Sequence, residues 1–459
     1  MAEPGSYMEH TLQALINSKK YLTLRDVLNT MNPADIAAVF DEMDGELLPL
    51  LFRLLPKELA ADTFVEMEPE AQEILIRGFS DRELKEVIDE MYVDDAVDII
   101  EEMPANVVKR ILAQADPDMR KDINLILRYP EDSAGSWMTT EYVSLRPAMT
   151  VEEAIKRIRR TGIDKETIYT CYVMSHDRQL VGLVTVKDLL LAEDDDEKIQ
   201  EIMVERVISV HTHDDQEAVA QMFQKYDFLA LPVVDSENRM VGIVTFDDAM
   251  DVMEDETTED MEKMTAMLPS EKPYMRSSPV EIWKKRIPWL LFLMISATFT
   301  GMIITHYEDA LAMQVVLVSF IPMIMGTTGN SGTQASVTVI RAISLGEIEF
   351  LDAVRVLWKE LRVSILCGVS LGVATFIKIS LFDRMLMGNM DLTVAVIATI
   401  SLTLTATVIL AKLVGGMLPM LAKKMGFDPT VMASPLIATI LDALSLIIYF
   451  QVATMLLHI

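Results

Sequence analysis

Residues 431–457, VMASPLIATILDALSLIIYFQVATMLL, form an apolar stretch that contains one ionisable side chain, Asp442. A helix needs about 20 residues to cross a bilayer, so this stretch predicts a membrane-spanning helix. A carboxylate near the middle of such a helix costs at least about 2 kcal/mol unless it faces water, an ion or a partner. We therefore interpret Asp442 as part of an ion pathway. The structural alternative is a protonated Asp that hydrogen bonds inside a helix bundle.

Four further stretches in the rear of the chain have the length and apolar character of membrane spans. They are residues 287–307, 313–343, 363–382 and 392–418. Basic residues precede the first, third and fifth spans, and such residues stay on the cytoplasmic side. The sequence thus predicts a multi-pass protein of the cell membrane with cytoplasmic front domains and an external C-terminus. These basic residues are Lys284, Lys285, Arg286, Arg355, Lys359, Arg362, Lys423 and Lys424.

The charge is divided unevenly along the chain, whose formal net charge is −30. Residues 280–459 contain 11 acidic and 12 basic side chains, so 59 of the 70 acidic and 28 of the 40 basic side chains precede them. A strongly acidic body repels nucleic acid and attracts cations. The six His and two Cys residues form no recognisable nucleophile and base pattern, and the chain contains neither HExxH nor a P-loop motif. The composition therefore excludes nucleic acid as a partner and argues against an enzyme.

Residues 32–117 repeat with a period of about twelve. The segments PADIAAVFDEM, KELAADTFVEM, RELKEVIDEM and DDAVDIIEEM end at Met43, Met67, Met91 and Met103. Pro or a capping residue follows most of them, which predicts short helices stacked as an α-solenoid. Asp94 and Asp98 are four residues apart on an exposed, acidic face, and such a like-charged pair is destabilising unless a cation visits it. A merely solvated face is the equally weighted alternative.

The middle of the chain contains a duplication at an offset of 60 residues. LVGLVTVKDLL at 180–190 matches MVGIVTFDDAM at 240–250, and each copy follows a helical and a strand-like segment. The order strand, helix, strand, strand, helix, found twice, resembles a tandem CBS pair. This resemblance implies an adenosine nucleotide such as ATP held at the ribose by Thr185, Asp188, Thr245 and Asp248. The alternative is that the same Thr and Asp side chains only cap helices.

A dense acidic run follows the second copy. It contains nine carboxylates between residues 247 and 262, interleaved with Met250, Met253, Met261 and Met264. This spacing predicts an amphipathic helix that leads toward the membrane. Its carboxylates repel one another, and a divalent cation would relieve the repulsion.

The second span contains IPMIMGTTGNSGTQASVTVIR at residues 321–341. Pro322 predicts an early break, and Gly326, Gly329 and Gly332 allow either close helix packing or irregular backbone around a wet cavity. The surrounding hydroxyls and amides offer oxygen atoms without charge. We interpret the stretch as a lining of the ion pathway.

The chain resembles the MgtE family of magnesium channels over essentially its whole length. The resemblance is carried by the junction YPEDSAGSWMTTEYVSL, the CBS pair, GTTGNSGTQAS and DPTVMASPLIATILDAL. It implies a homodimer in membrane lipid, with a pore formed by the second and fifth spans around a twofold axis. The implied pore residues are Asp442, Ala438 and Asn330. The implied cytosolic sensor and gate residues are Asp94, Asp98, Glu217, Asp227, Asp248, Asp251, Glu256, Glu259, Asp260 and Asp428.

The predicted fold is therefore a multidomain α + α/β + membrane architecture. An acidic α-helical solenoid is expected at residues 1–130, a tandem CBS pair at 131–253, a connecting plug helix at 254–280 and a five-span pore domain at 281–459. The predicted function is a magnesium-selective channel that cytosolic Mg²⁺ shuts by binding to the acidic sites. The alternative is a secondary transporter that couples divalent cations to sodium or protons, with Asp442 as a titrating relay.

Overall fold

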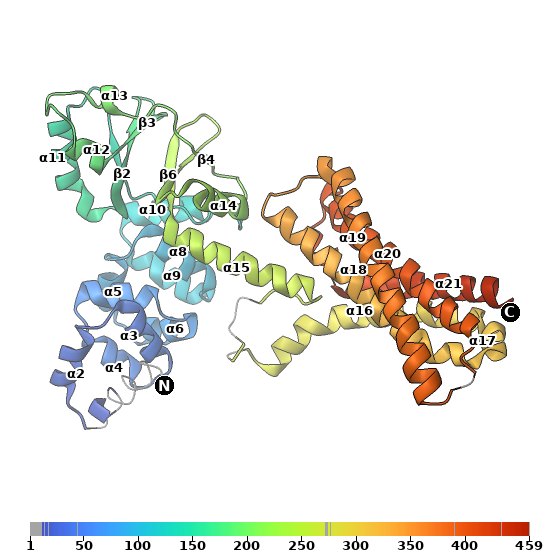
Figure 1. Ribbon diagram of the computed structural model, residues 1–459. Helices are drawn as coiled ribbons and strands as arrows, with labels where there is room; N and C mark the ends of the chain where they lie inside the picture. Colours follow the sequence, from blue (N-terminus) through green and yellow to red (C-terminus); the bar gives the residue numbers. More distant parts are fainter. Residues whose placement is uncertain are drawn as a thin grey trace. The chain divides into compact units, whose positions relative to one another are not determined.

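The structure, a computed structural model, describes residues 12, 14–16, 18–43, 45–270, 274–275, 277–389, 391–432 and 434–458. These residues form two compact units, Met1–Met253 and Glu254–Ile459 (Figure 1). The boundary lies inside one helix, α15 (Phe246–Met264). Each unit is described separately.

The first part of unit 1 is the predicted α-solenoid. Alternate helices contact each other, because each helix packs against the next but one along the chain. Met67, Met91 and Met103 of the twelve-residue repeat are buried in the shared core, and Met43 is partly buried against it. Helix starts carry the expected capping groups: Ser80 and Glu83 form a capping box, and Asp116 caps the last helix. The helices are α2 (Tyr21–Leu28), α3 (Pro33–Asp41), α4 (Leu48–Phe52), α5 (Lys57–Val65), α6 (Pro69–Gly78), α7 (Asp81–Ile88), α8 (Val93–Glu102), α9 (Ala105–Gln114) and α10 (Pro117–Ile126).

The second part of unit 1 contains two three-stranded sheets, which confirms the predicted tandem CBS pair. In each sheet the first strand is parallel to the second and the second is antiparallel to the third. Gly182 pairs with Val173 in one sheet and Gly242 with Val233 in the other, so the register is repeated. The elements are β1 (Tyr142–Leu145), α11 (Val151–Thr161), β2 (Thr167–Met174), β3 (Leu180–Thr185), α12 (Val186–Leu190), α13 (Ile199–Ile202), β4 (Val210–His211), α14 (Gln216–Tyr226), β5 (Ala230–Val234) and β6 (Met240–Thr245).

The acidic run forms one helix, α15, which starts directly after β6 and ends at Met264. Its first turns therefore complete the second CBS repeat, and its last turns belong to unit 2. Beyond it, the backbone amide of Leu268 donates to the carbonyl of Lys285, 3.2 Å away.

Unit 2 contains five helices that are long and apolar enough to cross a membrane, in agreement with the five predicted spans. α18 begins with Pro322 in its first turn, where the missing N–H costs nothing, and it continues unbroken through the glycine-rich stretch. The backbone of this stretch is regular, and close helix packing is shown at Gly332, whereas a Cβ atom at Gly326 would meet nothing within 4 Å. The helices are α16 (Pro279–His306), α17 (Glu308–Met313), α18 (Ile321–Ser344), α19 (Ala353–Lys378), α20 (Val394–Lys424) and α21 (Ser434–Leu457). Short 3₁₀ turns, η2 (Val315–Phe320), η3 (Phe350–Asp352) and η5 (Pro429–Met432), precede α18, α19 and α21, and a π-helical turn, Ile379–Leu386, follows α19.

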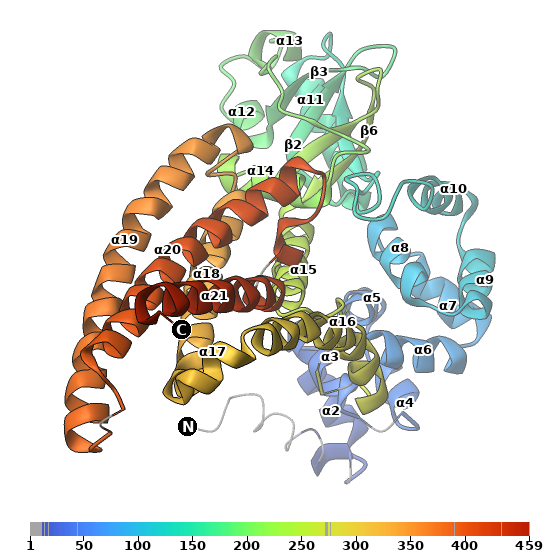
Figure 2. The same cartoon turned by 90° about the vertical axis from the view of Figure 1, so that its right-hand side faces the viewer.

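α18, α20 and α21 pack side by side, with α19 against α20 (Figure 2). Glycines allow this close approach. A Cβ atom at Gly332 would meet Leu441 and, at 3.2 Å, Ile437, both on α21, and one at Gly415 would collide with the backbone of Gly332. Without side chains at these positions, the backbones of α18 and α20 pack directly on each other and side chains of α21 fill the space beside Gly332, as small residues allow in membranes.

Replacing Gly332 with Ala is therefore expected to destabilise unit 2 by about 1–3 kcal/mol, because the added methyl group overpacks the α18, α20 and α21 contact. The matched control is Gly326→Ala on the same helix, where an added Cβ atom meets nothing within 4 Å. The measurement is thermal unfolding of the full chain in detergent. Equal melting temperatures for the two variants would contradict this account of the packing.

Candidate functional site

The predicted pore residues lie where α18 meets α21. A Cβ atom built on Gly329 would be 3.7 Å from the Cβ atom of Ala438 and 4.0 Å from Oδ1 of Asp442. Gly329 thus gives the Asp442 carboxylate open space on its α18 side, and Asn330, the next residue, is exposed. The structure brings Ala438 and Asp442 to the turn of α18 that carries Asn330.

The Asp442 side chain is half-buried, and its carboxylate has no hydrogen-bond or ion-pair partner among the described residues. Only its backbone carbonyl is engaged, as the acceptor of the Ser445 hydroxyl at 2.9 Å. A neighbouring hydroxyl on α18 is satisfied within the bundle: that of Thr328 donates to that of Thr407 on α20 at 3.0 Å. The Asp442 carboxylate therefore keeps unused capacity to bind a cation.

A second group of carboxylates gathers in unit 1, where α8 faces the start of α15. The first turn of α8 supplies Asp94 and Asp95, and α15 supplies Asp248. Asp94 is only 6% exposed, and its Oδ1 has no hydrogen-bond partner. Burial and the charge of Asp248 raise the pKa of Asp94 well above its usual range and that of Asp95 to about 7. Burial likewise raises the pKa of Asp248 to about 6.

Asp94 was predicted on an exposed face, and that prediction is wrong. The first turn of α8 is covered by the CBS part of unit 1, because Glu141 caps it: its carboxylate accepts from the backbone amide of Val93 at 3.1 Å. Asp98, one turn later, remains exposed. The repeat in the sequence shows which residues form the solenoid core, but not what covers its outer surface.

Glu141 and Glu166 belong to the same cluster, although neither was among the residues predicted from the sequence. Glu166 has a buried carboxylate oxygen without a hydrogen-bond partner. Burial, and then the charges of Asp95 and Asp248, raise its pKa to about 8. Each residue lies just before a strand of the first CBS copy, so no helical spacing marks them. The only signal in the sequence is that each is an acid beside a predicted strand.

A third group of charges lies in unit 2, at the end of α15. The Lys263 ammonium is 2.7 Å from Oε1 of Glu259 and 2.9 Å from Oδ2 of Asp428, which precedes η5 and α21. Asp260 accepts a hydrogen bond from Ser344 at the end of α18, and burial, followed by the charge of Asp428, raises its pKa. The structure therefore brings Glu259, Asp260 and Asp428 together, as the resemblance implies.

The other predicted sensor residues lie apart from these contacts or along α15. Glu217 accepts from Gln221 of its own helix at 3.2 Å. Asp227 ends α14 in a left-handed conformation, with φ of 54°, and is exposed. Asp251 is one turn beyond Asp248 and contributes to the raised pKa of Asp248, and Glu256 is partly buried on α15.

The Thr and Asp residues of the CBS pattern cap helices. The Thr185 hydroxyl accepts from the backbone amide of Asp188 at 3.1 Å, and the Asp188 carboxylate accepts from that of Thr185 at 3.0 Å. Thr245 likewise donates its hydroxyl to Asp248. Thr185 also lines a cavity of about 790 Å³ between the two copies, together with Lys187, Arg206 and Asp227. Thr185 therefore both caps a helix and lines this cavity.

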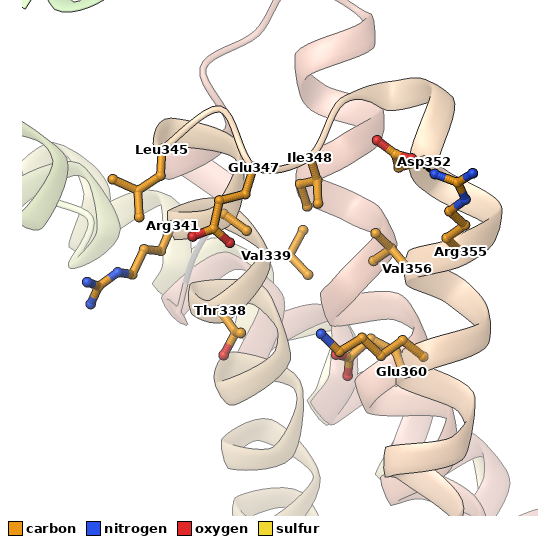
Figure 3. Close-up of a pocket in the computed structure, with 12 residues that line it drawn as sticks. Thr338, Val339, Arg341, Leu345, Glu347, Ile348, Asp352, Arg355, Val356 and Glu360 are labelled. Atoms are coloured by element: carbon orange, nitrogen blue, oxygen red, sulfur yellow. Dashed lines mark hydrogen bonds and ion pairs between the residues drawn. The ribbon is translucent and has the colours of Figure 1, made fainter. Parts of the chain in front are cut away.

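A pocket of about 480 Å³ lies between the end of α18 and the start of α19 (Figure 3). Within it, Asp352 and Arg355 form an ion pair with a separation of 3.0 Å. None of the predicted pore or sensor residues lines this pocket.

Among the residues that the structure describes, no three Asp, Glu, His or Cys side chains converge closely enough to bind one metal ion directly. The orphaned carboxylate oxygens of Asp94 and Glu166, and that of Glu262 on α15, nevertheless leave acceptors that a cation would satisfy. The clusters therefore fit a divalent ion that keeps part of its water shell, as Mg²⁺ usually does.

Comparison with known proteins agrees with this arrangement. Residues 31–132 match the MgtE intracellular N domain, residues 134–195 and 199–255 match the CBS domain, and residues 321–452 match a family described as a divalent cation transporter. The magnesium transporter MgtE of Thermus thermophilus is 36% identical over 98% of both chains. The magnesium transporter MgtE of Bacillus subtilis is 34% identical over 100% of both chains. The chain belongs to the MgtE family.

Solved structures of MgtE proteins match the front of the chain. The cytosolic domain of the Mg²⁺ channel MgtE in complex with ATP is 39% identical, with a TM-score of 0.51, and covers 53% of this chain and 99% of that chain. The soluble part of a magnesium transporter is 31% identical, with the same TM-score, and covers 55% and 99%. The family models that match the front of the chain confirm the order of N domain and CBS pair. Because MgtE proteins are transporters, they also confirm the prediction that the chain is not an enzyme.

The raised pKa values in the α8 cluster predict a pH-dependent stability. In the folded chain Asp95 and Glu166 hold protons up to about pH 7 and 8, whereas unfolded carboxyl groups lose them near pH 4. Their contribution to stability is therefore complete below about pH 4 and is lost as the pH rises to about 8. We expect protection of the α8 amides from hydrogen exchange, corrected for the intrinsic rate, to fall by at most about tenfold per pH unit and per group.

Hydrogen exchange of the full chain between pH 5.5 and 8.5 measures this effect. Glu166→Gln removes one titrating group and should flatten the profile. Glu193→Gln, at an exposed position, is the control and should leave the profile unchanged. A Glu166→Gln profile as steep as that of the parent chain would show that Glu166 does not titrate in this range.

Proposed function

We propose that this chain is a magnesium-selective channel of the cell membrane that cytosolic Mg²⁺ closes. The observation that carries the proposal is the unpartnered Asp442 carboxylate in a candidate membrane span, against Gly329 of α18. The MgtE relatives, which match the whole chain, support magnesium as the cargo. Mg²⁺ sheds its waters reluctantly, so a carboxylate with open space beside it suits the hydrated ion.

The proposed pore is formed by two copies of the chain. In a homodimer with a twofold axis, Asp442 of each copy would contribute one negative charge, and the pair would match the charge of a divalent ion. Asn330 is exposed in the single chain, next to Gly329, and its amide oxygen is the neutral ligand that we assign to the same mouth. The front domains are cytoplasmic in this proposal, and the C-terminus is external.

The proposed gate uses the acidic clusters of both units. At low cytosolic Mg²⁺ the carboxylates of α8 and the start of α15 repel one another in unit 1, and those of the end of α15 and the Asp428 loop repel one another in unit 2, which favours an open pore. Mg²⁺ binds the assembled arrangement more tightly than the separated one, because only the assembled arrangement gathers the charge. The ion therefore shifts the population toward the closed state.

A nucleotide is the proposed second ligand. The cavity lined by Thr185, Lys187 and Arg206 supplies a hydroxyl and two bases, which fit a ribose and phosphates. The structure of a relative's cytosolic domain in complex with ATP supports this proposal. Thr245 is the less suitable residue of the predicted set, because it is buried and hydrogen bonds to Asp248.

Asp442→Asn is expected to reduce Mg²⁺ flux into liposomes at least about a hundredfold, because the amide keeps the shape and removes the charge that attracts the cation. Asp391→Asn, in the loop before α20, is the matched control and should retain flux. A channel also predicts single-channel current steps without a sodium or proton gradient, whereas coupled flux that saturates would indicate the transporter alternative. Undiminished flux through Asp442→Asn would contradict the pore assignment.

Neutralising Asp248, Asp251, Glu256 and Glu259 together is expected to leave the current insensitive to cytosolic Mg²⁺, because the closed state loses its extra affinity for the ion. The measurement is patch-clamp of the reconstituted full chain with Mg²⁺ varied on the cytosolic side. A chain with the four acids intact should close as Mg²⁺ rises. Retained closure in the fourfold variant would rule out these residues as the sensor.

A further inference from the structure

Lys263 occupies a position between acidic groups of two different elements. Its ammonium contacts Glu259 on its own helix, at 2.7 Å, and Asp428 in the loop before α21, at 2.9 Å. The second contact joins α15 directly to the start of the span that carries Asp442. The side chain is 24% exposed, so the ammonium is partly withdrawn from water.

The Asp428 carboxylate is held in place for this contact. Its Oδ1 accepts from both the backbone amide of Thr430, at 2.8 Å, and the Thr430 hydroxyl, at 2.5 Å. These hydrogen bonds leave Oδ2 to face Lys263. The loop therefore presents one carboxylate oxygen in a fixed direction, whether or not Lys263 is opposite it.

The charges at this contact do not balance. Glu259, Asp260 and Asp428 supply three negative charges and Lys263 supplies one positive charge. Burial alone would lower the pKa of Lys263, but the hydrogen bonds to Glu259 and Asp428 outweigh burial and raise it above its usual value. The ammonium is thus charged at neutral pH, and Glu262 on the same turns adds a buried carboxylate oxygen without a hydrogen-bond partner among the described residues.

We propose that Lys263 is a tethered counter-ion that competes with Mg²⁺ for the carboxylates of Glu259 and Asp428, and so sets the Mg²⁺ concentration at which α15 closes the pore. This inference rests on the proposed function. Wherever α15 meets the Asp428 loop, the ammonium occupies both carboxylates. When Mg²⁺ arrives, it must either displace the ammonium or bind beside it against its repulsion, and both lower the apparent affinity.

A purely structural latch makes the opposite prediction. If the ion pair only held α15 against the loop, its removal would loosen the closed state, and more Mg²⁺ would be needed for closure. In the competition mechanism its removal exposes two unpaired carboxylates and less Mg²⁺ is needed. The direction of the shift therefore separates the two roles.

The test is a Mg²⁺ titration of the full chain in nanodiscs, read out as protection of residues 254–264 from hydrogen exchange and, in parallel, as channel current. For Lys263→Gln we expect the midpoint of protection to fall by up to about thirtyfold, the factor expected from the repulsion between a unit and a divalent charge about 4 Å apart in water. Lys263→Arg keeps the charge and should stay near the parent midpoint. Lys423→Gln removes an exposed charge near the same loop and is the matched control.

An unchanged or higher midpoint in Lys263→Gln would overturn the inference. Lys263→Met, which keeps the apolar stem of the side chain, carries the same expectation if the Gln variant does not fold. The parent chain separates this result from the proposed function. Absence of any Mg²⁺-dependent protection in the parent would refute the gate itself, whereas parent protection with an unshifted variant would refute only the role of Lys263.

Discussion

Repulsion between carboxylates that the fold itself brings together is the constraint common to the cytosolic helices and to the loop before the last span. Two like charges 4 Å apart cost about 1 kcal/mol in water and about 4 kcal/mol at the effective dielectric near a protein surface. In unit 1, Asp94, Asp95 and Asp248 face one another with Glu166 beside them. A domain that is stable by only about 5–15 kcal/mol cannot hold several such pairs ionised without compensation. A cation or a proton must therefore bind where the fold brings these carboxylates together.

The two units meet this constraint in different ways. In the α8 cluster the charge of Lys165 acts on Glu141, whereas burial and the neighbouring acids raise the pKa of Asp95 and that of Glu166 to about 7 and 8, so partial protonation provides relief there. At the end of α15 the chain supplies its own cation, Lys263. A divalent ion would replace the proton at the first site and compete with the ammonium at the second. The same ion would therefore act with different strength at the two sites, although the acids are alike.

The sequence predicts the elements of this fold well because they follow from local periodicity. The apolar stretches, the twelve-residue repeat and the 60-residue duplication each correspond to observed elements. The sequence says less about which acidic side chains come into contact in the folded chain. Glu141 and Glu166 join the cluster through the contact of the first CBS copy with α8, which depends on folding over tens of residues. Spacing along one helix identified Asp94, but the same spacing placed it at the surface, because periodicity contains no information about the neighbour that covers a face.

The candidate pore shows why similar glycines in one helix have different roles. Leu441, Ile437 and the backbone of Ala411 surround Gly332 and fill the space that a side chain would need. Gly329, one turn earlier, has Ala438 and the Asp442 carboxylate as its neighbours, at distances of 3.7 Å and more. A side chain there would contact the carboxylate and fill the space beside it. The packing at Gly332 thus sets the distance between α18 and α21. At that distance, the absence of a side chain at Gly329 leaves one side of Asp442 open. An acid in an apolar span is tolerable when such a space admits water or an ion. The same short stretch of α18 therefore allows the helices to pack closely and lowers the free-energy cost of the charge at Asp442.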